Sequence, residues 1–390
     1  MHAPVLFKED GIRNLILDRF EPQGIHAEWG EDTFLLDSRF RTPDYGAALY
    51  HESTYDAGRW RFTAGLRVDF EASKLHYRSY AEATYTTQTP DGTSYPHAIL
   101  VDQPGTLKQS FTEILPKISV LYRMGSSRRN TLYATVSKGY KAGGFNTQMF
   151  SDVLQQQVMK QMGFGSLYDV ADVVTYKPEK SWNYEVGAHL STPSHKVQAD
   201  LALFYIDCRD QQLTVFPEGQ VTGRLMTNAG RTRSFGGEAS LLAVMFLATL
   251  WRNLDLQVAY GYTRATFVKF DTGKADYAGN FIPYAPQHTL YAGASYTLRT
   301  GWNWLEYVIF RVAANGAGRI YWNEANTFSQ PFYALLEASI RFEHRHWAVD
   351  VWGRNLTDTR YDTFYFMSIG NSFLQRGRPR TFGVSLSITL

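Results

Sequence analysis

The chain has 390 residues, of which 15% are aromatic and only 19% are charged, whereas a typical soluble domain carries roughly 25% charged residues. Many rings and few charges disfavour an ordinary helical enzyme. The net charge of +2 gives no electrostatic reason to expect a nucleic acid partner. The longest apolar stretch, Leu241 to Trp251, has 11 residues, fewer than the roughly 18 that a membrane-spanning helix needs.

Motifs for catalysis or metal binding are not found in the sequence. The single cysteine, Cys208, cannot form an internal disulfide, and the ten histidines show no zinc-type spacing. No phosphate-binding glycine loop, nucleophile elbow or HExxH motif occurs. The sequence therefore predicts no catalytic residue, no cofactor and no metal site. Its first residues also lack the pattern of a secretory signal, so we expect either an internal protein or a piece of a longer precursor.

Apolar residues alternate with small or polar ones along most of the chain, which predicts β-strands whose successive side chains face opposite sides. The final segment shows this best, because Phe382, Val384, Leu386, Ile388 and Leu390 alternate with glycine, serine and threonine. In chain order, the clearest predicted strands cover residues 62–70, 182–190, 254–262, 290–298, 347–355 and 382–390.

Two classes of connection alternate between these strands. The short connections are predicted at residues 57–59, 125–129, 192–195, around 252–253, 300–302 and 343–345. The long ones are predicted at 88–108, 142–178, 216–222, 270–286, 323–330 and 358–375, with a short helix at 151–161 inside the longest. Long strands with tight turns at one end, long loops at the other and one apolar face are typical of an outer-membrane barrel.

We therefore predict an all-β, transmembrane antiparallel β-barrel, read as a single domain over residues 1–390, with about 13 or 14 strands. Seven stretches strengthen this reading, because together they resemble the C-terminal part of the barrel of a TonB-dependent outer-membrane receptor of the siderophore-receptor type. They are residues 60–69 (WRFTAGLRVD), 115–122 (LPKISVLY), 132–146 (LYATVSKGYKAGGFN), 176–187 (YKPEKSWNYEVG), 228–238 (NAGRTRSFGGE), 353–361 (GRNLTDTRY) and 376–390 (RGRPRTFGVSLSITL).

The resemblance implies a 22-stranded barrel around a globular plug, which imports scarce nutrients with energy delivered by TonB through the plug. It also implies a location in the bacterial outer membrane. Because no plug pattern precedes the barrel pattern in this sequence, we expect the plug and roughly the first eight strands to lie outside it. The chain alone is then not expected to transport. Its last residue, Leu390, departs from the aromatic residue with which family members usually end.

Two groups of residues are candidates for ligand contact at the mouth of such a barrel. The stretch 137–146 (SKGYKAGGFN) offers Tyr140, Lys141 and Asn146 where a strand leaves the membrane. The last long loop offers rings with a cation beside them, which suit an anionic, aromatic or planar ligand such as a ferric catecholate. These residues are Tyr361, Tyr365, Phe366, Phe373 and Arg376. The alternative for both groups is a purely structural role in strand exit and loop packing.

The function predicted from these features is energised uptake of a ferric siderophore or a similar scarce nutrient by an outer-membrane receptor. The expected partners are outer-membrane lipid, a plug with the N-terminal part of the barrel, the TonB complex acting through that plug, and the ligand; nucleic acid is not expected. A passive, porin-like channel with fewer strands is the alternative, and a soluble β protein is a third reading. The ligand class stays open among siderophore, haem, vitamin and oligosaccharide, although no histidine-bearing motif favours haem.

Overall fold

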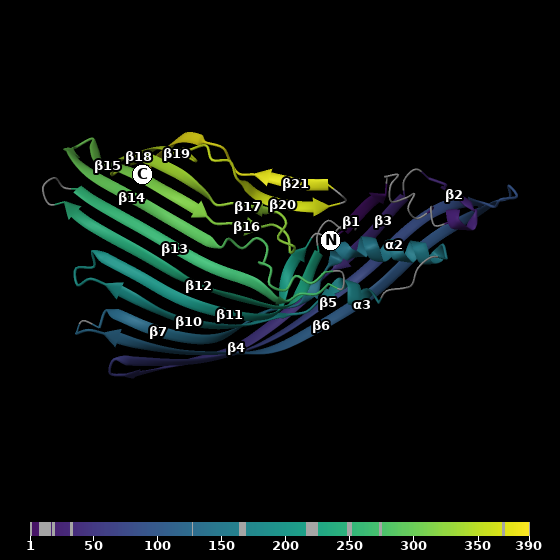
Figure 1. The fold of residues 1–390 in the computed structure, drawn as a ribbon, viewed down its shortest axis with the longest axis horizontal. Helices are drawn as coiled ribbons and strands as arrows, with labels where there is room; N and C mark the ends of the chain where they lie inside the picture. The colour runs from purple at the N-terminus through teal and green to yellow at the C-terminus, as the bar shows by residue number, and fades with distance from the viewer. Residues whose placement is uncertain are drawn as a thin grey trace.

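The protein folds around one large antiparallel sheet (Figure 1). The computed structural model describes residues 2–7, 17, 20–31, 34–126, 128–163, 169–215, 225–247, 252–272, 275–368 and 371–389. Within them, sixteen strands belong to this sheet. The predicted all-β fold class is confirmed.

The strands of the large sheet are β1 (His2–Phe7), β2 (His26–Trp29), β3 (Phe34–Arg41), β4 (Asp44–Ala57), β5 (Trp60–Gln88), β6 (Ser94–Met124), β7 (Asn130–Lys141), β10 (Glu179–Ser191), β11 (Val197–Val215), β12 (Leu225–Leu247), β13 (Arg252–Lys269), β14 (His288–Trp302), β15 (Leu305–Ala317), β18 (Tyr333–His344), β19 (Trp347–Arg354) and β22 (Thr381–Ile388). Three small hairpins pair β8 (Gly144–Phe145) with β9 (Thr175–Tyr176), β16 (Ile320–Tyr321) with β17 (Ser329–Gln330), and β20 (Asp362–Ser368) with β21 (Asn371–Arg376). The helices are η1 (Glu21–Gln23), η2 (Thr147–Met149), α2 (Phe150–Gln161) and α3 (Val170–Val174).

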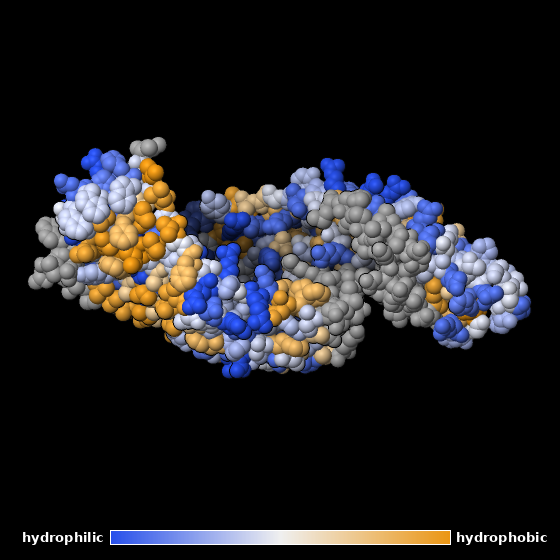
Figure 2. Space-filling view, turned by 90° about the horizontal axis from the view of Figure 1, so that it is seen from above, coloured by the Kyte–Doolittle hydropathy of each residue, from blue (hydrophilic) through white to orange (hydrophobic). Residues whose placement is uncertain are grey.

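Thirteen of the sixteen strands, all except β1, β2 and β3, form a continuous curved wall in the described part of the chain. Its outer face is apolar and exposed, as the alternation predicts: on β22, Phe382, Val384, Leu386 and Ile388 are each at least 65% exposed. Figure 2 shows hydrophobic side chains gathered over the end of the molecule where the tight turns lie, and a mainly hydrophilic opposite end. Such a surface fits a lipid environment.

Tight turns join the wall strands at one end, which we call the turn end, and long loops join them at the other, the mouth end. The predicted short connections at 57–59, 125–129 and 192–195 are confirmed, and the one predicted at 343–345 lies at 345–346. The one predicted at 300–302 was misplaced, because these residues end β14 and the turn lies at 303–304. Arg252 and Asn253 begin β13, because they continue its pairing with β14. The prediction of a turn there was wrong, and the β12–β13 junction falls in residues outside the described part. No described helix is both long and apolar enough to cross a membrane.

The predicted long loop at 88–108 was also wrong. β5 continues to Gln88 and β6 begins at Ser94, so both strands extend far beyond the wall. The extension is stabilised by burial of alternate residues such as Ala81, Tyr85, Ile99 and Val101 in a core shared with α2. We call this unit, made of β1, β2, β3, the ends of β5 and β6, and α2, the mouth-end module.

The helix predicted at residues 151–161 is confirmed as α2. Leu154 and Val158 are each only 1% exposed and pack against the extended sheet, while Phe150 contacts Phe40 and Tyr77 at ring distances of 4.9 and 4.6 Å. Burying such side chains contributes roughly 1.5–3 kcal/mol each. The mouth-end module therefore has a hydrophobic core of its own.

Candidate functional site

An aromatic cluster lies at the mouth end, where the loop before β14, the loop after β15 and the hairpin β20–β21 meet. We call it the mouth cluster, and its members are Tyr284, Trp322, Phe328, Phe364 and Tyr365. Tyr284 stacks on Phe364 at 5.5 Å and contacts Trp322 at 5.5 Å, while Phe328 lies 4.8 Å from Tyr365. Ring pairs at these distances contribute about 0.5–1.5 kcal/mol each beyond burial.

Polar contacts fix the three segments to one another. The Tyr284 hydroxyl donates to the backbone oxygen of Tyr365 at 3.1 Å, and the backbone N–H of Asp362 donates to Gln330 Oε1 at 2.8 Å. Tyr284 adopts a positive φ of 63°, which is unusual for a bulky residue. Burial raises the pKa of Tyr284 to about 12, with a smaller contribution from Glu324, whose own pKa burial also raises. The hairpin is therefore held by buried, uncharged contacts.

The hairpin presents a ring pair beyond the mouth cluster. Phe366 and Phe373 face each other across the strands, stacked at 4.9 Å, and Phe373 is 47% exposed. Arg376 is exposed and lies opposite Asp362 at the base of the hairpin. Strand alternation places Phe373 and Arg376 on opposite faces of β21. The stacked rings are thus available to a ligand from one side and the cation from the other.

Tyr361 holds the base of the hairpin. Its ring stacks on Tyr333 at 4.5 Å, and its backbone oxygen accepts from the N–H of Gly377 at 2.8 Å. A Cβ at position 377 would overlap the Tyr361 ring. These contacts give Tyr361 a packing role in the structure.

The second predicted group lies on another part of the wall. Tyr140 is near the end of β7, its hydroxyl is buried, and it has no hydrogen-bond partner among the described residues. The carboxylates of Glu71, Glu113 and Asp69 act on it electrostatically. Lys141 is exposed one position further along.

Asn146 is tied to the start of β12. Its side-chain amide donates to the Met226 oxygen at 2.7 Å, and its Oδ1 accepts from the Met226 N–H at 2.8 Å. Both ends of this amide are therefore occupied by backbone. The structure thus brings Tyr361, Tyr365, Phe366, Phe373 and Arg376 together in one hairpin and its base, and places Tyr140, Lys141 and Asn146 apart from it on β7 and the loop that follows.

The inner face of the wall is polar and hollowed. A depression of about 820 Å³ is lined by Tyr133, Glu185, His189, Asp200 and Glu238, among others. The Tyr133 hydroxyl donates to Glu185 at 2.7 Å, and His189 Nδ1 lies 2.7 Å from Asp200 Oδ1. No group of three or more possible metal ligands occurs in the part of the chain that the structure describes. The inner face therefore offers hydrogen bonds and negative charge.

Tyr284, Trp322 and Phe328 all build the mouth cluster but were not predicted as candidate site residues from the sequence. They lie in loops, where no periodicity marks which ring points inward. One signal was present: the segment 281–286 (FIPYAP) concentrates rings and prolines, which is unusual for a loop that only connects strands.

Comparisons with known proteins agree with this architecture. Residues 17–356 match the family model described as the TonB dependent receptor-like β-barrel. The chain is 26% identical over 282 residues to the pesticin receptor of Yersinia pestis, covering 72% of this chain and 37% of that protein. The pesticin receptor of Yersinia enterocolitica matches over the same shares. The chain thus spans little more than a third of the length of these relatives.

Solved structures show the same fold. The ferric yersiniabactin uptake receptor of Yersinia pestis superposes with a TM-score of 0.66 at 21% identity, covering 91% of this chain and 48% of that one. The ferric preacinetobactin receptor of Acinetobacter baumannii gives a TM-score of 0.55 at 13% identity, with shares of 92% and 55%. Receptors of this type are non-enzymatic proteins of the outer membrane. The chain therefore belongs to the TonB-dependent receptor family and forms part of its β-barrel.

Proposed function

We propose that the chain is the C-terminal wall and mouth of a receptor for a ferric siderophore or a similar scarce nutrient. The observation that carries this proposal is the hairpin β20–β21, which presents a stacked, half-exposed ring pair with an exposed arginine at its base. A planar or anionic metal chelate that folds around the hairpin would meet the rings on one face and the guanidinium on the other, through stacking and cation–π contact. The names of the relatives, a pesticin receptor and a ferric yersiniabactin uptake receptor, support the same ligand class.

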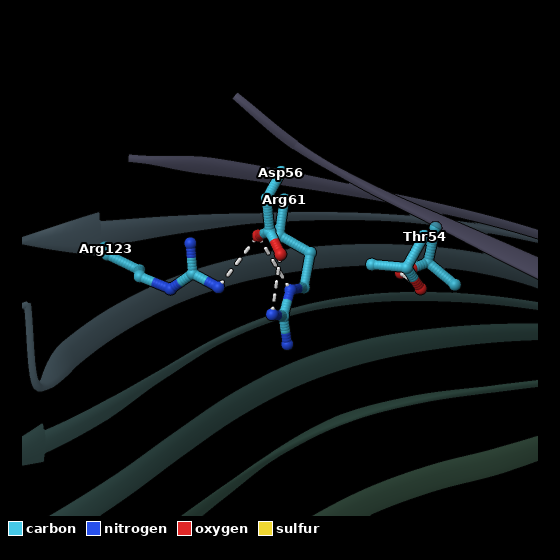
Figure 3. Close-up of polar contacts among 5 residues, drawn as sticks. Thr54, Asp56, Arg61 and Arg123 are labelled. Atoms are coloured by element: carbon cyan, nitrogen blue, oxygen red, sulfur yellow. Dashed lines mark hydrogen bonds and ion pairs between the residues drawn. The ribbon is translucent and has the colours of Figure 1, made fainter. Parts of the chain in front are cut away.

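The two edges of the wall support the further proposal that a complementary segment completes the barrel. Within the described residues, β4 pairs only with β5 and β22 pairs only with β19. Lipid offers no partner to the free N–H and C=O groups of such edges, so a spanning sheet has to close on itself. On its other side β4 is tied to the wall: Asp56 accepts from Arg61 at 2.8 and 3.0 Å and from Arg123 at 2.9 Å (Figure 3).

Strand direction restricts what this segment is. Both β4 and β22 run from the mouth end to the turn end, because the described wall has an odd number of antiparallel strands, thirteen, and its first and last strands therefore have the same direction. If β4 paired with β22, the two strands would be parallel. The same would hold if β4 paired with β4 of a second copy that lies in the membrane in the same orientation. Antiparallel closure needs an odd number of additional strands. Nine would complete the 22 that the family resemblance implies, one more than the sequence suggested.

The inner face supports the proposal of a plug. Glu185, Asp200 and Glu238 line the depression on the inner face, and wall carboxylates of this kind would pair with basic residues of a domain inside the barrel. Such a plug would carry the link to TonB and move when TonB pulls it. Ligand binding at the mouth and opening of the path are then separate steps, performed by separate parts of the receptor.

A porin-like channel is the competing function, and electrical conductance tests it. We expect the chain alone to give no stable ion conductance in planar bilayers, because its edges cannot close in antiparallel fashion. Co-insertion with the segment that supplies the remaining strands and the plug should give a closed, largely non-conducting receptor. Discrete, long-lived open channels from the chain alone would instead favour the porin.

A further inference from the structure

A patch of cations faces outward on the mouth-end module, directly above the apolar belt of the wall. We call it the basic patch, and it consists of Arg39, Arg41, Lys74, Arg78 and Lys108. On β5 and β6 beyond the wall, odd-numbered residues such as Leu75, Ser79, Ile99 and Val101 are buried beneath α2. The even-numbered residues therefore lie on the opposite, outward face, which continues the lipid-facing side of the wall.

The register places like charges directly opposite each other. Lys74 pairs with Lys108 across β5 and β6, and Arg39 pairs with Arg78 across β3 and β5. Arg41 lies opposite His76. Like charges in directly opposed positions destabilise a sheet. An arrangement of this kind becomes favourable when an anion lies over it and neutralises both members of each pair.

Acidic neighbours neutralise only part of the patch. Arg78 binds Asp102 through two hydrogen bonds of 2.7 and 2.8 Å, and Arg39 lies 3.3 Å from Asp37. Arg41, Lys74 and Lys108 have no ion-pair partner among the residues that the structure describes, and Arg41 and Lys108 are exposed. Three cations are thus available to an external anion.

The height of the basic patch fits a lipid headgroup. Phe70 on β5 and Ile114 on β6 are 47% and 56% exposed on the outward face and mark the upper part of the apolar belt. Lys74 is four residues beyond Phe70 on the same face of β5, and Arg78 is eight residues beyond it. At about 3.4 Å per residue, the patch covers roughly 14 to 27 Å along the strand above Phe70, and less in height because wall strands are tilted.

We propose that the basic patch binds the phosphates of the glycolipid in the outer leaflet, a lipopolysaccharide with a phosphorylated disaccharide headgroup. The acyl chains would lie against the apolar belt below, while Arg41, Lys74 and Lys108 contact the phosphates. Arginine and lysine are suited to this contact as strong donors to phosphate oxygens. The two surfaces are continuous along β5 and β6, so a single lipid molecule reaches both.

Native mass spectrometry of the receptor, assembled with its complementary segment in the outer membrane and purified, tests this proposal. We expect bisphosphorylated glycolipid to remain bound to the native sequence. A variant with Arg41→Gln, Lys74→Gln and Lys108→Gln should retain at least tenfold less. The matched control changes three exposed cations at the turn end, Arg59→Gln, Lys196→Gln and Arg345→Gln, and should retain the native amount.

A charge-preserving variant, Arg41→Lys, separates loss of charge from loss of fold and should keep most of the lipid. Added glycolipid with its phosphates removed should not bind, and millimolar inorganic phosphate should not displace the bound lipid. Equal retention by the neutralised variant, equal binding of the dephosphorylated lipid, or displacement by inorganic phosphate would each overturn the proposal. Ligand uptake is not needed as a readout, so this test is independent of the siderophore assignment.

Discussion

Replacing Gly236 with alanine is expected to destabilise the wall by about 2 kcal/mol. Gly236 lies in β12 opposite Phe204 of β11 and Thr263 of β13. A Cβ at this position would overlap the backbone oxygen of Tyr262 and approach the Phe204 ring to 2.8 Å. Backbone of a neighbouring strand cannot rotate away as a side chain does, so β12 and β13 would have to separate. Overpacking of this kind costs about 1–3 kcal/mol.

The matched control for this substitution is Gly46→Ala. Gly46 also lies in a wall strand, β4, but its added Cβ would meet only ordinary contacts at 3.7 and 3.8 Å. Urea unfolding of the assembled receptor in lipid bilayers should show a loss of about 2 kcal/mol or more for Gly236→Ala, and less than about 0.5 kcal/mol for Gly46→Ala. Similar stabilities for the two variants would mean that the close approach of β12 and β13 does not constrain the wall.

Removing the exposed ring and the cation of the hairpin is expected to reduce affinity for a ferric siderophore about 100-fold. Phe373→Ala removes half of the stacked pair, and Arg376→Ala removes the positive charge at the hairpin base. Ring stacking and cation–π contacts are worth up to about 1.5 and 2 kcal/mol respectively. Each 1.4 kcal/mol is a factor of ten in affinity, so each single variant should lose about tenfold.

Binding of a radiolabelled ferric siderophore to cells that carry the assembled receptor measures this effect. Trp304→Ala with Arg345→Ala is the matched control, because it removes an exposed ring and an exposed cation at the turn end. Arg376→Lys should recover much of the affinity, since it keeps the charge. Unchanged affinity in the double variant would show that the hairpin rings serve loop packing alone.

The wall was predictable from sequence because a lipid-facing sheet imposes period-two alternation on every strand. The predicted strands at 62–70, 182–190, 254–262 and 290–298 all lie within wall strands, and the one at 382–390 coincides with β22 as far as Ile388. Residue 390, at the end of the last one, lies outside the described part. The loop predicted at 216–222 also lies outside it.

The mouth-end module was not predictable in the same way. Pro96, Pro104 and Gly105 made residues 88–108 look like a loop, yet they lie within β6. Proline is tolerated in an edge strand, where its missing N–H faces no partner. β6 pairs with β7 only from Lys117 onward, so over the module it has β5 as its sole neighbouring strand in the described structure.

The mouth cluster was only half predictable. The rings of the last loop stand close together in sequence, so their grouping at residues 361–376 was visible. Their partners Tyr284, Trp322 and Phe328 come from loops some 40 to 80 residues earlier, and only the pairing of β14, β15, β18, β19 and β22 side by side in the sheet brings them to the hairpin. The same distance in sequence hid the role of Asn146, which binds Met226 on a strand 80 residues away.

Iron uptake by cells tests the central claim most directly. The host is a strain without its own siderophore receptors. It would produce either the chain alone or the chain together with the segment that carries the remaining strands and the plug. A third strain would produce the two segments together but lack TonB. We predict accumulation of radioactive iron from a ferric siderophore only when both segments and TonB are present. Uptake by the chain alone, or uptake by the assembled receptor without TonB, would contradict the account.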